Sequence, residues 1–187
     1  MLKNLKKQLG SEKDKAIFDI VIYGSIVKGK EDARDIDILV IFLEGSLKER
    51  LNKLQEIKSR LKDMKIEAEL DMKQILLKEL FSSSFLARTG ILLEGVSIFT
   101  NKKFCETLGF KSFTLFWYSL TGLTHLEKVK FNYIFAGRNT KGVIEEVNGQ
   151  RLVNGAIKVP IENSAIIEGI LKTNKIQYHK KNILEEA

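Results

Sequence analysis

The chain has 187 residues, of which 44% are hydrophobic and 29% charged, with one cysteine and a formal net charge of +7. These proportions are typical of one globular domain, with or without an extension, and exclude an intrinsically disordered chain. One cysteine excludes an internal disulfide, and a thiolate zinc site would need several. No apolar run approaches the roughly 20 residues that span a bilayer, and no apolar stretch follows the basic N-terminus as in a signal peptide. We therefore expect a cytoplasmic protein with no membrane partner.

The positive charge is spread along the chain. Residues 1–103 hold 20 Lys and Arg against 16 Asp and Glu, a net charge of +4, and residues 104–187 hold 11 against 8, a net charge of +3. An RNA or DNA partner and a solvated lysine-rich surface explain this distribution equally well.

The first hundred residues predict helices and strands in alternation. A short N-terminal helix is predicted by leucines at helical spacing, Leu2, Leu5 and Leu9. The apolar run 17–23 predicts a buried strand that ends in a tight turn, and the run 35–43 predicts a second, central strand. Ser46 and Glu49 form a capping box, which predicts the start of an amphipathic helix.

A third strand is predicted over residues 66–72, where apolar and acidic side chains alternate. Apolar positions between 75 and 93 predict a helix over residues 73–95 that ends at Gly95, and residues 96–99 predict a short edge strand. We therefore expect an α/β (α+β) fold, a small mixed sheet flanked by helices, in a domain of residues 1–103.

Residues 104–187 predict a smaller α+β extension. The aromatic run 110–120 either fills an interface with the first domain or offers stacking platforms for bases. Thr124 and Glu127 form a second capping box, and the helix that they open ends at Gly137. We also expect a strand over 156–159, a helix over 164–171 and a strand over 176–179.

The residues that carry chemistry lie where the first strand ends and the second begins. Asp35 and Asp37 are two positions apart in a strand, so both carboxylates point to one side, about 6.6–6.8 Å apart along it. Such charges repel one another, and a divalent cation is their natural partner; hard oxygen ligands suit Mg²⁺ or Mn²⁺.

The turn after the first strand has the complementary property. Gly24 lets a ligand approach the backbone closely, and the N–H groups of a turn that leads into a helix favour anions. Ser25 adds a hydroxyl donor, while Lys28 and Arg34 add positive charge nearby. A phosphate cradle beside two metal-binding carboxylates indicates phosphoryl or nucleotidyl transfer.

This pattern resembles the signature of the DNA polymerase β-type nucleotidyltransferase superfamily. That signature is a hydrophobic residue, Gly, Gly or Ser, a spacer, and then Asp–hydrophobic–Asp–hydrophobic. Gly24-Ser25 and Asp35-Ile36-Asp37-Ile38 match it, and Val27-Lys28-Gly29 stands where many small members carry Ala-Arg-Gly. The resemblance covers roughly residues 16–99 and implies a small mixed sheet with helices.

The resemblance also implies that Asp35 and Asp37 bind catalytic metal ions and that a neighbouring strand supplies a third carboxylate. Glu67, Glu69 and Asp71 share one face of the third predicted strand. Because one sequence does not fix the register of that strand, we choose the middle residue, Glu69, and keep Glu67 and Asp71 as alternates.

We therefore expect a metal-dependent nucleotidyltransferase that binds an NTP and moves its NMP to an acceptor hydroxyl. An RNA or DNA end fits the positive charge. A protein acceptor is the main competitor, since minimal members of the family act as antitoxins that adenylylate a partner toxin, and a small molecule such as an aminoglycoside is a third class. The alternative to an enzyme is an inactive nucleotidyltransferase fold that serves as a binding module.

Three further residues are expected to have no part in catalysis. Cys105 lacks a neighbouring residue that would activate it and is expected to be buried. His125 and His179 have no metal-ligand spacing and are expected at the surface or at a helix end.

Overall fold

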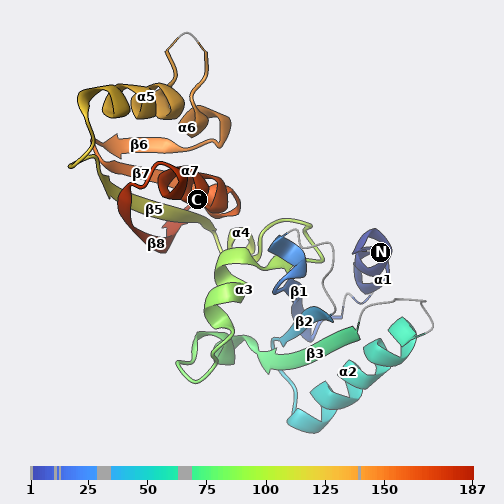
Figure 1. The fold of residues 1–187 in the computed structure, drawn as a ribbon. Coiled ribbons are helices and arrows are strands. Elements are labelled where there is room, and N and C mark those ends of the chain that lie inside the picture. Colours follow the sequence, from blue (N-terminus) through green and yellow to red (C-terminus); the bar gives the residue numbers. More distant parts are fainter. Residues whose placement is uncertain (1, 11, 13, 29–34, 63–68, 139) are drawn as a thin grey trace. The chain divides into compact units, whose positions relative to one another are not determined.

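The computed structural model describes residues 2–10, 12, 14–28, 35–62, 69–138 and 140–187. The chain divides into two compact units, Met1–Gly109 and Phe110–Ala187 (Figure 1). Each unit contains a sheet covered by helices and a hydrophobic core of its own. The fold class predicted from the sequence, a mixed α+β chain with a small sheet flanked by helices, is confirmed.

The sheet of the first unit has the strand order β3-β2-β1-β4. β1 (Ile17–Tyr23) is antiparallel to β2 (Asp35–Phe42) and to β4 (Val96–Ser97), whereas β3 (Glu69–Leu76) runs parallel to β2. The two central strands are buried along most of their length, which explains the apolar runs that predicted them. A short 3₁₀ turn, η1 (Ile26–Lys28), follows β1.

Helices cover both faces of this sheet. α1 (Leu2–Gly10) and α2 (Leu47–Lys62) pack on the face that carries Ile36, Ile38 and Val40 of β2. η2 (Leu77–Phe81), α3 (Arg88–Glu94) and α4 (Phe104–Thr107) cover the opposite face, which carries Leu39 and Ile41. The odd-numbered residues of β2, Asp35 and Asp37 among them, therefore share the face covered by η2, α3 and α4.

The capping box that predicted α2 is present. The Ser46 backbone N–H donates to Glu49 Oε2 at 2.7 Å, and the Glu49 N–H donates to Ser46 Oγ at 3.3 Å. Two of the N–H groups that a helix leaves unpaired at its start are satisfied in this way.

The helix predicted over residues 73–95 is wrong in its first part. β3 continues to Leu76, because its parallel ladder with β2 extends as far as the pair Phe42–Leu76. The Glu79 carboxylate accepts a hydrogen bond from the Leu76 N–H at 2.6 Å, and the 3₁₀ helix η2 begins there. Only Arg88–Glu94 forms an α-helix, and it ends at Gly95 as predicted.

The second unit follows the order strand–helix–helix–strand–strand–helix–strand. Its elements are β5 (Phe110–Ser119), α5 (His125–Ala136), α6 (Val143–Glu146), β6 (Gln150–Val153), β7 (Ala156–Pro160), η3 (Ile161–Asn163), α7 (Ser164–Thr173) and β8 (Gln177–Glu186). The antiparallel sheet has the order β6-β7-β5-β8, so β5 and β7 are its central strands. This connectivity is the split βαβ arrangement.

One face of the second sheet carries the core of the unit. Phe116 of β5 and Ile157 of β7 pack there against α5, α6 and α7. The predicted capping box at Thr124 and Glu127 is present, and α5 ends at Gly137, which has a φ of +77°. The aromatic run is itself a strand, β5, whose alternate residues enter this core.

Candidate active site

Gly24 occupies the turn between β1 and η1 with a φ of +82°, a left-handed conformation that favours glycine. It also lies against a carboxylate of the neighbouring strand. A Cβ atom at this position would come within 2.0 Å of Asp37 Oδ2. Glycine therefore permits both the left-handed conformation of the turn and the close approach of the backbone to Asp37. Ser25 follows it, half-buried.

The strand register places three side chains side by side on the face covered by η2, α3 and α4. Asp37 pairs with Tyr23 of β1 on one side and with Asp71 of β3 on the other. Asp35, two residues earlier on β2, is exposed at the start of the strand, and Asp37 is half-buried.

Burial and neighbouring charges both act on Asp37. Burial raises the pKa of Asp37, and the negative charges of Asp35 and Asp71 raise that pKa further, while Lys73 lowers it. The raised pKa of Asp37 thus reflects its burial first and the negative charges of Asp35 and Asp71 second. A cation that binds here relieves this repulsion.

The two predicted candidates on β3 differ in position. Glu69 pairs with Asp35 at the exposed end of the strands, whereas Asp71 pairs with Asp37 and is half-buried. The charge of Asp71 acts on Asp37. The third candidate, Glu67, lies outside the described residues, as does Arg34.

Lys73 was not anticipated from the sequence. Its Nζ lies 2.7 Å from Asp71 Oδ2 and forms an ion pair with that carboxylate. The hydrogen bond to Asp71 raises the pKa of Lys73, and the charge of Asp37 raises it further. Lys73 stands two residues after Asp71 and so points to the same side of β3. Only the strand that replaced the predicted helix brings it here.

The Tyr23 hydroxyl is a second group that the sequence did not single out. The side chain is 8% exposed, and its oxygen forms no hydrogen bond of good geometry with the described residues. Burial raises the pKa of Tyr23, and the charges of Asp37 and Asp71 add to this, while nearby Lys73 lowers it. A buried polar atom therefore faces the same carboxylates.

The carboxylates fit a divalent cation by their chemistry and charge. Among the described residues, no three His, Cys, Asp or Glu side chains gather closely enough to hold a metal ion as they stand. The Asp71 carboxylate is paired with Lys73 in this arrangement. Asp35, Asp37 and Asp71 would hold such an ion, because carboxylate oxygens are the donors that Mg²⁺ and Mn²⁺ prefer.

A further acid, Asp19 of β1, is buried but has a structural role. Its Oδ1 accepts hydrogen bonds from the Ile20 N–H at 2.7 Å and from Ser97 Oγ at 3.0 Å. The bond from Ser97 ties β1 to β4. Burial raises the pKa of Asp19.

The three residues expected to take no part in catalysis stand on elements other than β2 and β3. Cys105 is buried, as predicted, and His125 begins α5 at the surface. His179 is exposed on β8. Of the helices that the structure describes, none combines the length and apolar character needed to cross a membrane.

Comparison with known proteins identifies one family. The model of the polymerase beta nucleotidyltransferase family matches residues 3–103. One similar solved structure is a toxin–antitoxin complex with AMP-PNP, with 21% identity, a TM-score of 0.34, and coverage of 51% of this chain and 70% of that chain. A mutant MntA–HpeT toxin–antitoxin complex has 18% identity, a TM-score of 0.33, and coverage of 51% and 70%.

A complex of the tri-AMPylated HEPN toxin of Shewanella oneidensis with the MNT antitoxin has 21% identity, a TM-score of 0.31, and coverage of 51% and 66%. None of the curated proteins matches the chain.

Proposed function

Because the chain belongs to the polymerase beta nucleotidyltransferase family, and is a nucleotidyltransferase, we propose that it transfers an NMP from an NTP to an acceptor hydroxyl with the help of a divalent cation. Asp35, Asp37 and Asp71 hold the cation in this proposal. Asp71 takes the place of Glu69, because Asp71 pairs with Asp37 in the strand register and its charge acts on Asp37.

The observation that carries the proposal is the contact between the turn and the central strand. A Cβ atom built on Gly24 would lie only 2.0 Å from Asp37 Oδ2, so the backbone of the turn lies directly against the Asp37 carboxylate. A triphosphate that lies along Gly24 and the Ser25 hydroxyl is therefore beside the cation-binding oxygens. This is the juxtaposition that nucleotidyl transfer requires.

The chain's own residues bind and orient the substrates. Gly24 admits the phosphates to the backbone, and Ser25 donates a hydrogen bond to a phosphate oxygen. The bound cation supplies charge neutralisation and Lewis-acid polarisation of the phosphates. The acceptor oxygen forms a bond to the α-phosphorus as the bond from that phosphorus to pyrophosphate breaks, and the acceptor proton passes to solvent.

The experiment that tests the proposal labels each NTP on its α-phosphate and incubates it with the protein, Mg²⁺ and a whole-cell extract. Label that enters RNA, DNA, protein or a small molecule identifies the acceptor class. Asp37→Asn should abolish the incorporation, because the amide keeps the shape of the side chain and loses the charge that binds the cation.

Glu56→Gln is the matched control, since Glu56 is an exposed acid on α2, which packs on the opposite face of the sheet. It should incorporate label as the parent does. Incorporation that persists in Asp37→Asn, or that proceeds equally in EDTA, contradicts the proposal.

A further inference from the structure

The second sheet has one face covered by helices and one open face. Along β5, Phe116 belongs to the core beneath α5, α6 and α7, and Trp117 is 43% exposed on the opposite side. The open face therefore carries the odd-numbered residues of β5 and β8, because both strands alternate and pair residue by residue.

This open face carries aromatic, aliphatic and basic side chains. Trp117 pairs with His179 across the β5–β8 ladder, and Leu115, the next outward residue, pairs with Lys181. Lys111 lies further along the same side of β5. His179, Lys181 and Lys111 are exposed.

One acid shares this face, and it is already paired. Glu185 forms an ion pair with Lys158 of β7 at 2.5 Å, and the Lys158 ammonium group also lies 4.7 Å from the centre of the Phe113 ring. Apart from the Glu185–Lys158 pair, the charged side chains of this face are lysines, Lys181 and Lys111. The whole unit has eleven Lys and Arg against seven Glu, a net charge of +4.

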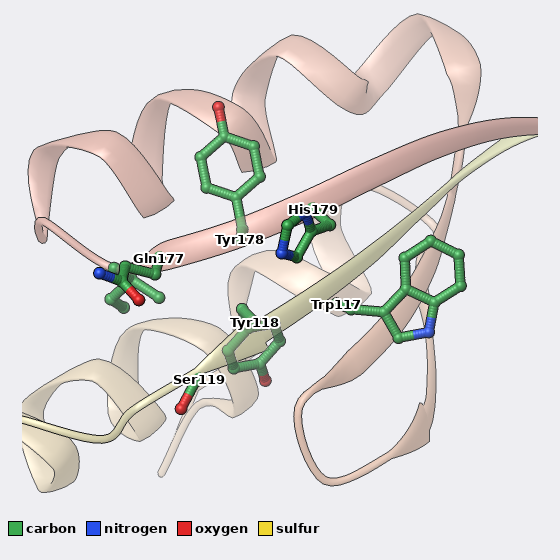
Figure 2. A pocket seen from close by; sticks show the side chains of 7 residues that line it. Trp117, Tyr118, Ser119, Gln177, Tyr178 and His179 are labelled. Atoms are coloured by element: carbon green, nitrogen blue, oxygen red, sulfur yellow. The ribbon is translucent and has the colours of Figure 1, made fainter.

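A hollow of about 770 Å³ lies where the β5–β8 ladder ends (Figure 2). Trp117 and His179 line it together with the last ladder pair, Ser119 and Gln177. Its volume is in the range of small-molecule sites. An indole face beside an imidazole, a hydroxyl and an amide offers a stacking surface for a base and partners for the polar edge of that base.

We propose that this open face binds single-stranded nucleic acid. A base stacks on Trp117 within the hollow, and Lys181 and then Lys111, which follow in one direction along the β5–β8 ladder, contact the phosphates of the strand that leaves the hollow. The four-stranded sheets of RNA-recognition motifs stack bases on exposed aromatic side chains in the same way. The proposal rests on the exposed aromatic and basic side chains of this face, because a shared architecture does not by itself imply a function.

The same features argue against the other macromolecular partners. Protein interfaces are depleted in lysine, and a protein docked here would have to bury two of them. A duplex keeps its base faces stacked and inaccessible to Trp117, whereas a single strand exposes them. If the chain transfers a nucleotide as proposed above, the bound strand supplies the acceptor hydroxyl. The binding of the strand itself requires neither NTP nor Mg²⁺.

The experiment measures binding of the full chain to labelled single-stranded oligouridylate and oligothymidylate, and to a duplex of the same length, without NTP. The fluorescence of Trp117, the only tryptophan of the chain, should be quenched by the single strands. Trp117→Ala should weaken their binding by about 5- to 150-fold. The two oligomers show whether RNA or DNA is preferred.

Tyr133→Ala is the matched control, because Tyr133 is 44% exposed and lies on α5. It should bind as the parent does. Lys181→Gln should reduce the magnitude of the log–log salt slope by about 0.7, whereas Lys130→Gln, an exposed lysine of α5, should leave the slope unchanged.

Trp117→Leu keeps an apolar side chain without an aromatic face, and circular dichroism checks that each variant is folded. Equal losses for Trp117→Leu and Tyr133→Ala overturn the proposal. It is also overturned if no single strand binds at 50 mM salt, or if a duplex binds as tightly without quenching Trp117. Because no NTP is present, these outcomes are independent of whether the first unit transfers a nucleotide.

Discussion

At the scale of single residues, the candidate active site depends on how closely Gly24 approaches Asp37. Two features of this position favour glycine. The backbone has a φ of +82°, and a side chain would clash with Asp37 Oδ2. The first concerns the stability of the turn, and the second concerns the position of the carboxylate. A single substitution can separate them.

Gly24→Ala should disturb the site more than the fold. The left-handed φ costs about 1–2 kcal/mol for a residue with a Cβ. The Cβ clash is relieved when the Asp37 carboxylate rotates away, since that oxygen is the free end of a side chain. We expect the loss of Mn²⁺ binding in a calorimetric titration, with an unfolding free energy lowered only by this small amount.

The double variant Gly24→Ala/Asp37→Ala is the control for the clash. Removing the Asp37 side chain removes the clash, so Gly24→Ala should destabilise an Asp37→Ala background by the φ cost alone. Unchanged Mn²⁺ binding in Gly24→Ala would show that Asp37 does not hold the cation in the observed orientation.

Lys73 is expected to compete with the cation for Asp71. The ion pair at 2.7 Å is formed by an exposed lysine, and exposed pairs contribute about 0.2–1 kcal/mol. Lys73→Met should therefore tighten Mn²⁺ binding by about 1.4- to 5-fold. Lys73→Arg keeps the charge and should bind Mn²⁺ as the parent does. Weaker binding in Lys73→Met would indicate that the lysine supports the bound state instead.

At the scale of elements, features that depend on local sequence could be predicted, whereas features that depend on the register between remote strands could not. The strands at 17–23 and 35–42 and both capping boxes depend on local patterns, and they could be predicted. β3 could not be predicted to its full length. The apolar residues near Ile75 and Leu80 fit a helix as well as a strand, and the pairing with the remote strand β2 decides between them.

The same register determines the site residues. Four of the proposed site residues lie close together in the sequence, so their pattern could be recognised: Gly24, Ser25, Asp35 and Asp37. The pairing of Asp71 with Asp37, and the position of Lys73 beside them, depend on the alignment of β3 with β2. A one-residue shift would move these side chains to the other face.

Glu168 of α7 links helix and strand in the second unit, and this link should be sensitive to acid. It accepts hydrogen bonds from Lys172 Nζ at 2.8 Å, from Lys180 Nζ, and from the Tyr178 hydroxyl at 2.8 Å. These bonds lower the pKa of Glu168 from 4.5 to about 2. A lowered pKa stabilises the fold above pH 4.5, and this stabilisation is lost as the pH falls toward 2.

Urea unfolding followed by Trp117 fluorescence should therefore give a smaller unfolding free energy at pH 2 than at pH 4.5. Glu168→Gln should lose much of this pH dependence. Glu145→Gln should retain it, because the ion pair that Glu145 forms with Lys141 is exposed on both sides. Equal pH profiles for the parent and Glu168→Gln would exclude Glu168 as the source of the effect.

At the scale of the whole molecule, each unit closes a hydrophobic core with its own elements. In the first unit, helices cover both faces of the mixed sheet, and the proposed nucleotide site lies on it. In the second, α5, α6 and α7 close the core on one face of the sheet. This construction predicts that nucleotide binding and nucleic-acid binding are separable properties of one chain.

Residues 110–187, expressed alone, should fold and bind the single-stranded oligomers with the affinity and Trp117 quenching of the full chain. Residues 1–109 should bind an NTP with Mg²⁺ but not the oligomers. Each fragment should unfold in one cooperative transition, because a core of this size supports an independent domain. Circular dichroism and the two binding titrations check these outcomes. A fragment 110–187 that folds but fails to bind would mean that the first unit takes part in holding the strand.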